Sequence, residues 1–466
     1  MKRMIVAVMA LAGLMLSSAN LPAQERKPNV VLIVADDLGW ADVGAHRQSK
    51  DVKTPHIDAL AAAGVRFTSG YVSGPVCSPT RAGLLTGRYQ QRFGFEQNPR
   101  GPQEEAVFGL PLDEVTLPQS LKQAGYVTGM VGKWHLGTRD DMRPPKRGFD
   151  EFFGFLGGAH RYMDNDEPAV KDKNAIRRGD EPVGEKEYLT DAFTREAVSF
   201  IERHKDKPFF LYLPYNAPHS PMQVPQEYLS RFPDEKDEKR RAFLAMMASM
   251  DDGIGRIMAT LREQKLEEDT LVIFFSDNGG PTPGNASLNT PFRGTKGSTF
   301  EGGVRVPFMM AWKGRLPAGK VEDRMIVQLD LFPTILALAG AELPQGKPID
   351  GKDLLPYLTG QKDGPVHEAL FWRFGPRRGI RAGDWKLQWN AQQSPALYDL
   401  AQDPGESKDL ASAKPEIVEK LMKQYTGWDA QLMKPRWPGR LEGDGGAPAG
   451  EAPAAPARRR RANQAQ

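Results

Sequence analysis

The stretch NVVLIVADD, residues 29–37, is an apolar run rich in β-branched residues that ends in two aspartates. Its length and composition predict one buried strand of a parallel sheet. The same design recurs in YVTGMVGKWHLG (126–137), PFFLYLPYNAPH (208–219) and TLVIFFSDNGG (270–280). Helical patterns separate these runs, as at 189–204. This alternation predicts an α/β fold with a mostly parallel central sheet flanked by helices.

Polar side chains follow two of these runs where the strands are expected to end. Asp36 and Asp37 close the first run, and Asp277 and Asn278 close the last one. Ligands of open α/β sheets bind beyond the carboxyl ends of the strands, so the four side chains are expected to meet at one edge. Either pair alone is better explained as the cap of a turn. Together, four oxygen donors favour a divalent cation such as Ca²⁺ or Mg²⁺ over zinc.

The two ends of the chain differ from its middle. Residues 1–23 combine two basic residues, an apolar run and small residues, which is typical of a secretory signal peptide, with a retained anchor as the alternative. Residues 441–466 are rich in Gly, Ala, Pro and Arg and are expected to be disordered. Between them we expect a large α/β domain at 24–360 and a smaller α+β domain with a short antiparallel sheet at 361–440. The protein is expected to be exported, to the periplasm or the medium.

Composition argues against several classes of protein. The formal net charge of +3 includes Lys2 and Arg3 of the signal and the four arginines at 458–461, so the remaining chain carries −3. Such a chain lacks the basic face that nucleic-acid binding requires. Beyond the signal, no segment is apolar enough to cross a bilayer, which argues against stable membrane insertion. The single cysteine, Cys77, excludes an internal disulfide.

Cys77 lies in GPVCSPTRAGLLTGRY, residues 74–89. Ser78 and Pro79 are typical of a helix start, which would place Cys77 at the helix N-terminus and Arg81 one turn away on the same face. The helix dipole and the arginine would favour an anionic nucleophile at this position. From these residues alone, a packed core cysteine remains the slightly safer interpretation.

The motif CSPTR resembles Cys-x-Pro-x-Arg, the signal by which type I sulfatases have this cysteine converted to Cα-formylglycine. Five further blocks resemble that family in its order: 28–44, 125–137, 216–225, 274–280 and 291–307. The chain is thus similar to formylglycine-dependent sulfatases, most of all to the N-acetylgalactosamine-6-sulfatase and arylsulfatase A branch. The resemblance implies an alkaline-phosphatase-like large domain, hydrolysis of sulfate monoesters with release of inorganic sulfate, and a formylglycine-generating or equivalent maturation enzyme as partner.

The resemblance also implies a role for each matched residue. One Ca²⁺ ion would be held by Asp36, Asp37, Asp277, Asn278 and the modified Cys77. The catalytic residues implied in this way are Cys77 as nucleophile precursor, Arg81 as its brace, Lys133 and His135 flanking it, and His219 and Lys296 at the sulfate and the leaving oxygen. A hydrated aldehyde is needed because an ordinary serine would keep the sulfate as a stable ester.

The substrate expected from this resemblance is a sulfated polysaccharide or its oligosaccharides. Candidate sugar contacts are His160, Arg161, Tyr162, Trp372 and Arg373, since aromatic rings stack on sugars and arginine binds anionic groups. For Trp372, simple packing remains equally open. The alternatives to a sulfatase are a formylglycine-dependent phosphodiesterase or phosphonate monoester hydrolase, and a binding protein that has kept the fold and lost the chemistry.

Overall fold

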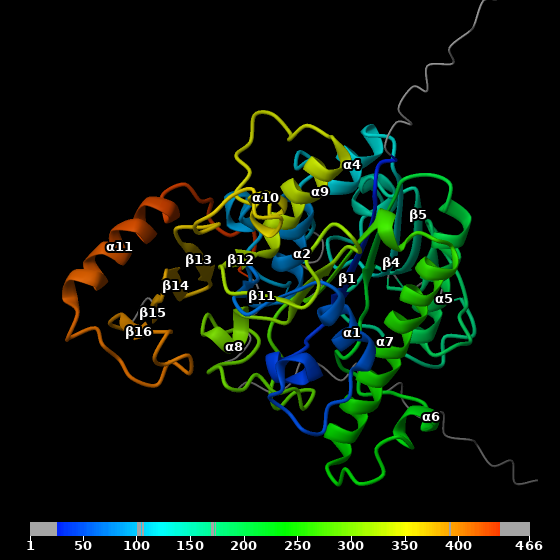
Figure 1. Ribbon diagram of the computed structural model, residues 1–466, viewed down its shortest axis with the longest axis horizontal. Helices are drawn as coiled ribbons and strands as arrows, with labels where there is room; N and C mark the ends of the chain where they lie inside the picture. Colours follow the sequence, from blue (N-terminus) through cyan, green and yellow to red (C-terminus); the bar gives the residue numbers. More distant parts are fainter. Residues whose placement is uncertain are drawn as a thin grey trace, which may run out of the picture.

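The computed structural model describes residues 26–99, 104, 107–168, 172, 174–390 and 393–438. The predicted signal peptide and the predicted disordered tail lie outside the described residues. The described chain forms a large twisted sheet with helices on both faces and a smaller sheet to one side (Figure 1).

The large sheet has ten strands, and its centre is parallel. The strand order is β11 (Lys320–Glu322), β2 (Val65–Phe67), β10 (Phe308–Ala311), β9 (Thr270–Ser276), β1 (Asn29–Ala35), β8 (Phe209–Pro214), β4 (Val127–Lys133), β5 (Glu151–Phe155), β6 (Arg177–Arg178) and β7 (Glu181–Pro182). The five strands from β9 to β5 run parallel, whereas β10, β6 and β7 pair antiparallel with their neighbours. The prediction of a mostly parallel central sheet is confirmed.

Two helical layers cover this sheet because successive side chains of a strand point to opposite faces. Alternate residues of β1 enter two separate apolar cores, one on each face. One face carries α1 (Pro55–Ala63), α5 (Leu189–His204) and α7 (Glu238–Glu263), with α6 (Gln226–Leu229) against α7. The other carries α2 (Cys77–Thr86), α4 (Leu117–Gln123), α9 (Leu331–Ala339) and α10 (Leu355–Leu358). The helices expected between the strands are thus present on both faces.

The small sheet is wholly antiparallel and consists of β13 (Leu370–Phe374), β14 (Arg377–Ala382), β15 (Trp385–Asn390) and β16 (Ala396–Asp399). Helix α11 (Pro415–Asp429) covers it, with Trp428 stacked on Phe371. Side chains of this sheet join the same apolar core as β1 and α2. Three further short elements are β3 (Gly70–Tyr71), its partner strand β12 (Ile326–Val327), and α8 (Glu301–Val304).

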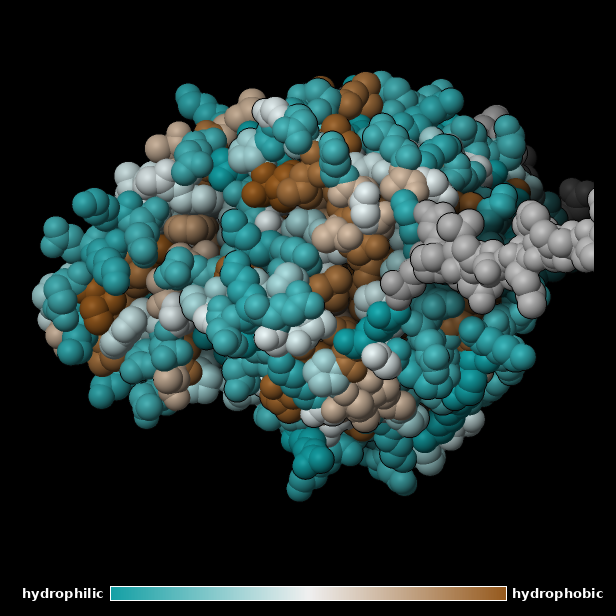
Figure 2. Space-filling model, turned by 45° about the horizontal axis from the view of Figure 1, so that its top comes forward, coloured by the Kyte–Doolittle hydropathy of each residue, from teal (hydrophilic) through white to brown (hydrophobic). Residues whose placement is uncertain are grey.

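The face shown in Figure 2 is mainly hydrophilic, with hydrophobic residues scattered in small groups. Among the described residues, no helix has both the length and the apolar character needed to cross a membrane.

Candidate active site

Four neighbouring strands of the large sheet deliver polar side chains to one edge. Asp36 and Asp37 follow β1, and Asp277 and Asn278 follow β9. Three further groups reach this edge: Lys133 as the last residue of β4, His219 in the loop after β8 and Cys77 as the first residue of α2. The parallel strands end together, which explains why residues distant in sequence meet here.

Cys77 lies in the middle of this cluster and is almost completely buried. Its Sγ is 3.4 Å from Asp36 Oδ1 and 3.3 Å from Lys296 Nζ. Burial, together with the charge of Asp36, raises the pKa of the Cys77 thiol well above its usual value despite the nearby lysines. Burial thus opposes ionisation of the thiol, whereas the helix start and Arg81 were expected to favour an anionic nucleophile at this position.

Oxygen atoms gather beside Cys77 in a way that fits a hard cation. Ligand atoms of Asp36, Asp37, Cys77 and His219 all lie within 4.8 Å of one another. Asn278 Nδ2 donates to Asp37 Oδ1 at 2.7 Å, whereas Asn278 Oδ1 is buried and has no hydrogen-bond partner. A buried carbonyl oxygen without a donor, beside carboxylates, is the chemistry that Ca²⁺ satisfies.

Three basic side chains form hydrogen-bonded ion pairs with the carboxylates. Arg81 donates to Asp277 Oδ2 from Nε at 3.0 Å and from Nη2 at 2.7 Å, and Lys133 Nζ donates to Asp36. Lys296 Nζ donates to Asp37 Oδ2 at 3.0 Å. These partners keep the site compact, because an unpaired buried charge would be strongly destabilising.

The two aspartates that follow different strands have opposite pKa shifts. Burial alone would raise the pKa of Asp37, but the charges of Lys296 and His219 outweigh it and lower the pKa to about 2. Burial and the charge of Asp36 raise the pKa of Asp277 to about 6, although Arg81 opposes that shift. Three carboxylates and three cations therefore meet in the cluster, and burial is the main reason that one carboxyl group has a raised pKa.

Both histidines of the site are neutral near pH 7. Burial lowers the pKa of His219 to about 4, against the influence of Asp37, whose Oδ2 is 3.5 Å from Nε2. Burial and the charge of Lys133 hold the pKa of His135 well below its usual value. His135 adopts a left-handed backbone conformation with φ of 57°, and its buried Nδ1 has no hydrogen-bond partner. Each ring can therefore accept a proton.

The residues predicted to contact a sugar do not share one location. His160 is partly exposed, and Arg161 is exposed, with its Nε bonded to Asn165. Tyr162 and Trp372 are buried, and Trp372 Nε1 donates to Val72 O. Arg373 is also buried.

The three guanidinium nitrogens of Arg373 already donate hydrogen bonds: Nε to Glu96, Nη1 to Asp429 and Nη2 to Met433 O. Burial and these existing partners favour packing over sugar contact for Tyr162, Trp372 and Arg373, whose predicted role as sugar contacts stays a prediction. These side chains pack the interior and support neighbouring loops.

Several supporting contacts were not predicted from the sequence, which offered Tyr162 only as a sugar contact. Tyr162 donates its hydroxyl hydrogen to the carbonyl oxygens of Asn216 and His219, with oxygen–oxygen distances of 2.5 and 2.7 Å. Ser78 Oγ donates to His135 O at 2.6 Å. The side-chain amide of Asn216 is buried beside the His219 loop with neither its oxygen nor its nitrogen bonded. No periodicity marks these residues, because each acts through a backbone carbonyl distant in sequence.

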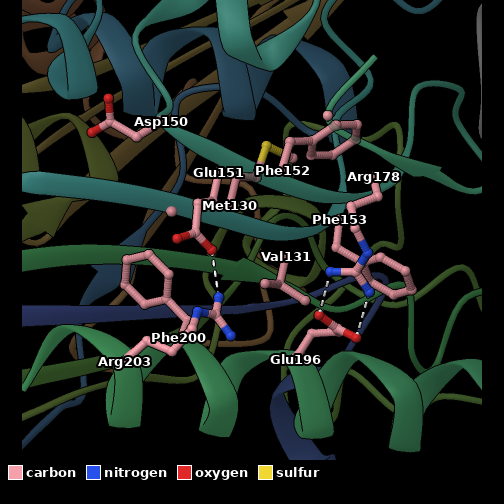
Figure 3. A pocket seen from close by; sticks show the side chains of 12 residues that line it. Met130, Val131, Asp150, Glu151, Phe152, Phe153, Arg178, Glu196, Phe200 and Arg203 are labelled. Atoms are coloured by element: carbon pink, nitrogen blue, oxygen red, sulfur yellow. Dashed lines mark hydrogen bonds and ion pairs between the residues drawn. The ribbon is translucent and has the colours of Figure 1, made fainter. Parts of the chain in front are cut away.

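A cavity lies along the middle of β4 and the first residues of β5, against α5 (Figure 3). It has a volume of about 340 Å³. Arg178 forms two bonds of 2.7 Å with Glu196, and Arg203 pairs with Glu151. Because both arginines are ion-paired across the cavity wall, it does not present the free positive charge that a sulfate group would need.

Comparisons with known proteins identify the family. A family model described as Sulfatase matches residues 28–341, and one described as N-sulphoglucosamine sulphohydrolase, C-terminal, matches residues 295–431. N-acetylgalactosamine-6-sulfatase of Canis lupus familiaris is 35% identical over 462 residues, covering 88% of this chain and 87% of that protein. Human arylsulfatase A is 34% identical over 476 residues, covering 90% and 91%.

Solved structures agree with these matches. Ps i-CgsB, determined in complex with k-i-k-neocarrahexaose, has a TM-score of 0.82 and 36% identity, covering 88% of this chain and 95% of that one. The PsFucS1 sulfatase from Pseudoalteromonas sp. has a TM-score of 0.74 and 27% identity, covering 88% and 91%. The large sheet with its small antiparallel companion is thus the alkaline-phosphatase-like fold of these proteins. The chain belongs to the sulfatase family, in the branch of N-acetylgalactosamine-6-sulfatase and arylsulfatase A, and is a sulfuric ester hydrolase.

Proposed function

We propose that this enzyme is an exported sulfatase that hydrolyses sulfate monoesters of polysaccharides or their oligosaccharides, with Cys77 converted to Cα-formylglycine by a maturation enzyme. The observation that carries the proposal is the position of Cys77. Its Sγ lies 3.4 Å from Asp36 Oδ1 and 3.3 Å from Lys296 Nζ, and Asn278, whose Oδ1 has no partner, is bonded to the neighbouring Asp37. A high thiol pKa at this position suits a precursor better than a thiolate nucleophile.

The donor set fits one calcium ion, to be held by Asp36, Asp37, Asp277, Asn278 and the modified residue 77. When bound, the ion would offset the negative charge of the sulfate group and acidify a hydroxyl next to it. The formylglycine hydrate would supply two hydroxyls on one carbon, one to attack sulfur and one to expel the sulfate afterwards.

The chain's own residues would then orient the groups and move protons. Arg81, fixed on Asp277 and on Lys133 O, braces residue 77 from the helix side. Lys133 and Lys296 add positive charge where the sulfate oxygens must lie. The leaving oxygen must take up a proton, and the proposed donor is the Lys296 ammonium or His219 in its protonated form, with Nε2 3.5 Å from Asp37 Oδ2.

His135 is proposed to accept the proton of the second hydroxyl. Its ring is neutral near pH 7 because of burial, and Nδ1 has no competing partner. Ser78 Oγ holds the His135 carbonyl, and the ring of Phe108 lies 5.7 Å from the His135 ring. These contacts support the His135 backbone and pack against its ring.

The substrate class rests on two observations. The similar protein Ps i-CgsB was determined in complex with k-i-k-neocarrahexaose, and several relatives are named N-acetylgalactosamine-6-sulfatase. His160 and Arg161 remain the proposed contacts to the sugar, since both reach the surface on the loop after β5.

The test is sulfate release from a panel of defined sulfated oligosaccharides by enzyme coexpressed with a formylglycine-generating enzyme. Conversion of Cys77 is checked by mass spectrometry of its peptide. We expect hydrolysis of at least one glycan sulfate at a rate far above that of phosphate diesters and phosphonate monoesters. Dominant diesterase or phosphonate hydrolase activity, or an unmodified thiol in active enzyme, would contradict the proposal.

A further inference from the structure

Lys296 belongs to a glycine-rich segment, residues 293–301, which we call the Lys296 loop. On its catalytic side this loop is attached to the large sheet. Lys296 N donates to Gly280 O at 3.2 Å, and Gly297 N donates to Pro75 O at 2.8 Å. Because Pro75 lies two residues before Cys77, any shift of the loop changes the 3.3 Å separation between Lys296 Nζ and Cys77 Sγ.

The other side of the Lys296 loop contacts the small sheet. Thr299 Oγ1 donates to Gln388 Oε1 of β15 at 2.8 Å, and both side chains are buried. Arg377 of β14 donates to Gly297 O, next to the catalytic lysine. Since these bonds are shielded from solvent, water cannot replace a lost partner without rearrangement.

An ion pair anchors the end of the loop to the same strand. Glu301 is the last residue of the loop and the first of α8, which lies between the large sheet and β15 in Figure 1. Lys386 Nζ of β15 is 2.7 Å from Glu301 Oε1, and both side chains are 0% exposed. Burial would raise the pKa of Glu301, but Lys386 and Arg305 outweigh it and lower the pKa to about 2.

A buried ion pair contributes little net stability compared with apolar packing, but it tolerates no mismatch. The pair between Glu301 and Lys386 therefore defines one register between the loop and β15. Glu301 N also donates to Glu406 Oε2 at 2.7 Å, which adds a second contact from the segment after β16.

We propose that the small sheet is a positioning device for Lys296, in which Gln388 and Lys386 hold the Lys296 loop through Thr299 and Glu301. The inference rests on the proposed role of Lys296 at the reacting sulfate. Gln388 and Lys386 contact no reacting atom and act only through the loop. Because a displacement of about 1 Å from reactive geometry can cost on the order of 10²-fold in rate, losing one contact should lower kcat and leave KM nearly unchanged.

The experiment removes one contact from each side. Thr299→Val deletes the hydroxyl and keeps the shape, Thr299→Ser keeps the hydroxyl, and Gln388→Leu removes the partner in β15. The substrate is the sulfate ester that the full-length wild-type enzyme hydrolyses fastest, and rates are normalised to the converted fraction of Cys77. We expect Thr299→Val and Gln388→Leu to lower kcat about tenfold with KM within about twofold. Thr299→Ser should restore kcat to within about twofold of the wild type.

The matched control is Thr334→Val in α9. Thr334 is equally buried, and its Oγ1 donates to Asp330 O at 2.6 Å, but it lies outside the Lys296 loop. We expect its kcat to equal that of the wild type. A comparable loss of kcat in Thr334→Val would mean that any buried threonine matters, which would overturn the inference.

A second background decides whether the effect runs through the lysine. In Lys296→Ala enzyme, adding Thr299→Val should change the residual kcat by less than about twofold, because there is no amine left to position. An equal loss in both backgrounds, or no loss in either, overturns the inference and leaves the sulfatase proposal intact. Full activity of Lys296→Ala alone would instead refute the role of Lys296 and the inference with it.

Discussion

Two buried groups of polar and charged side chains contact the Lys296 loop, one at Lys296 and the other at Glu301. The catalytic group lies at the carboxyl ends of the strands and consists of Cys77, Asp36, Asp37, Asp277, Asn278, Arg81, Lys133, Lys296, His135 and His219. The other group, which we call the Glu301 cluster, lies against the small sheet and consists of Tyr71, Glu301, Arg305, Arg381 and Lys386. Both groups bury several charges within a few ångströms, yet they differ in whether every buried polar atom has a hydrogen-bond partner.

In the Glu301 cluster, no side-chain N or O atom of the five described residues is buried without a partner. In the catalytic group, Asn278 Oδ1 and His135 Nδ1 are buried with none. Unsatisfied buried polar atoms are rare and call for a ligand or a reaction to explain them. Other described residues, such as His46 and Thr190, also bury an atom without a partner. The comparison therefore teaches that a functional site is marked by buried charge and unsatisfied atoms together, and by neither alone.

The largest effect is expected when Cys77 is removed from the catalytic group. Cys77→Ala should lower sulfate release by on the order of 10⁴-fold or more, because no formylglycine can form. The stability cost should be only about 1 kcal/mol, since a single buried atom group is deleted. Sulfate release and thermal unfolding are measured together; turnover retained in a folded variant would refute the proposed mechanism.

The complete group should respond in the opposite way. Lys386→Met leaves Glu301 ionised and buried, so we expect a loss of about 3–5 kcal/mol in the free energy of unfolding. The double variant Lys386→Met/Glu301→Gln should recover part of that loss. Denaturant unfolding gives both values. An unchanged free energy of unfolding for Lys386→Met would show that the ion pair with Glu301 does not stabilise the fold.

A matched control comes from an exposed lysine. Lys122 pairs with Asp150 at the surface, with the lysine side chain 56% exposed. Lys122→Met should cost less than about 1 kcal/mol, because solvent already screens that pair. A loss as large as that of Lys386→Met would mean that lysine replacement itself, rather than burial, is responsible.

The catalytic edge was more predictable from the sequence than its surroundings. Asp36, Asp37, Asp277 and Asn278 each follow an apolar run, so strand topology alone brings them to one edge. Their order along the chain also resembles a known family. The roles of the glycine-rich loops were not predictable in this way.

Tyr162 illustrates why. An aromatic residue in a polar, glycine-rich loop is equally consistent with a sugar platform and with a buried prop, and only the fold shows that its hydroxyl reaches His219 O. Likewise, Glu301 and Lys386 are 85 residues apart, and neither local pattern indicates that the two charges pair. Contacts between loops and sheets depend on the tertiary arrangement, which periodicity does not encode.

Removal of calcium tests whether a bound cation satisfies the unpaired buried atoms of the catalytic group. If a cation completes the catalytic group, a chelator should abolish activity and also lower the melting temperature. At an ion concentration of 100 times Kd, bound calcium would contribute about 2.7 kcal/mol of stability. Added Ca²⁺ should restore both properties. Thermal unfolding and sulfate release that are indifferent to the chelator would leave Asn278 Oδ1 unexplained and contradict the metal site.

The smallest expected effect concerns Tyr162, which supports the His219 loop of the catalytic group. Tyr162→Phe removes the hydroxyl that donates to Asn216 O and His219 O, so the His219 loop loses two bonds while the ring stays packed. Leaving buried carbonyls without a donor costs about 1–3 kcal/mol, part of which should appear as a several-fold lower kcat through His219. The control is Tyr188→Phe, whose ring stacks 5.7 Å from that of Tyr162 and whose hydroxyl bonds Gln223 O instead. If kcat falls for Tyr162→Phe and not for Tyr188→Phe, the Tyr162 hydroxyl holds the His219 loop in its active position. Equal losses of kcat would assign the effect to the aromatic packing and not to His219.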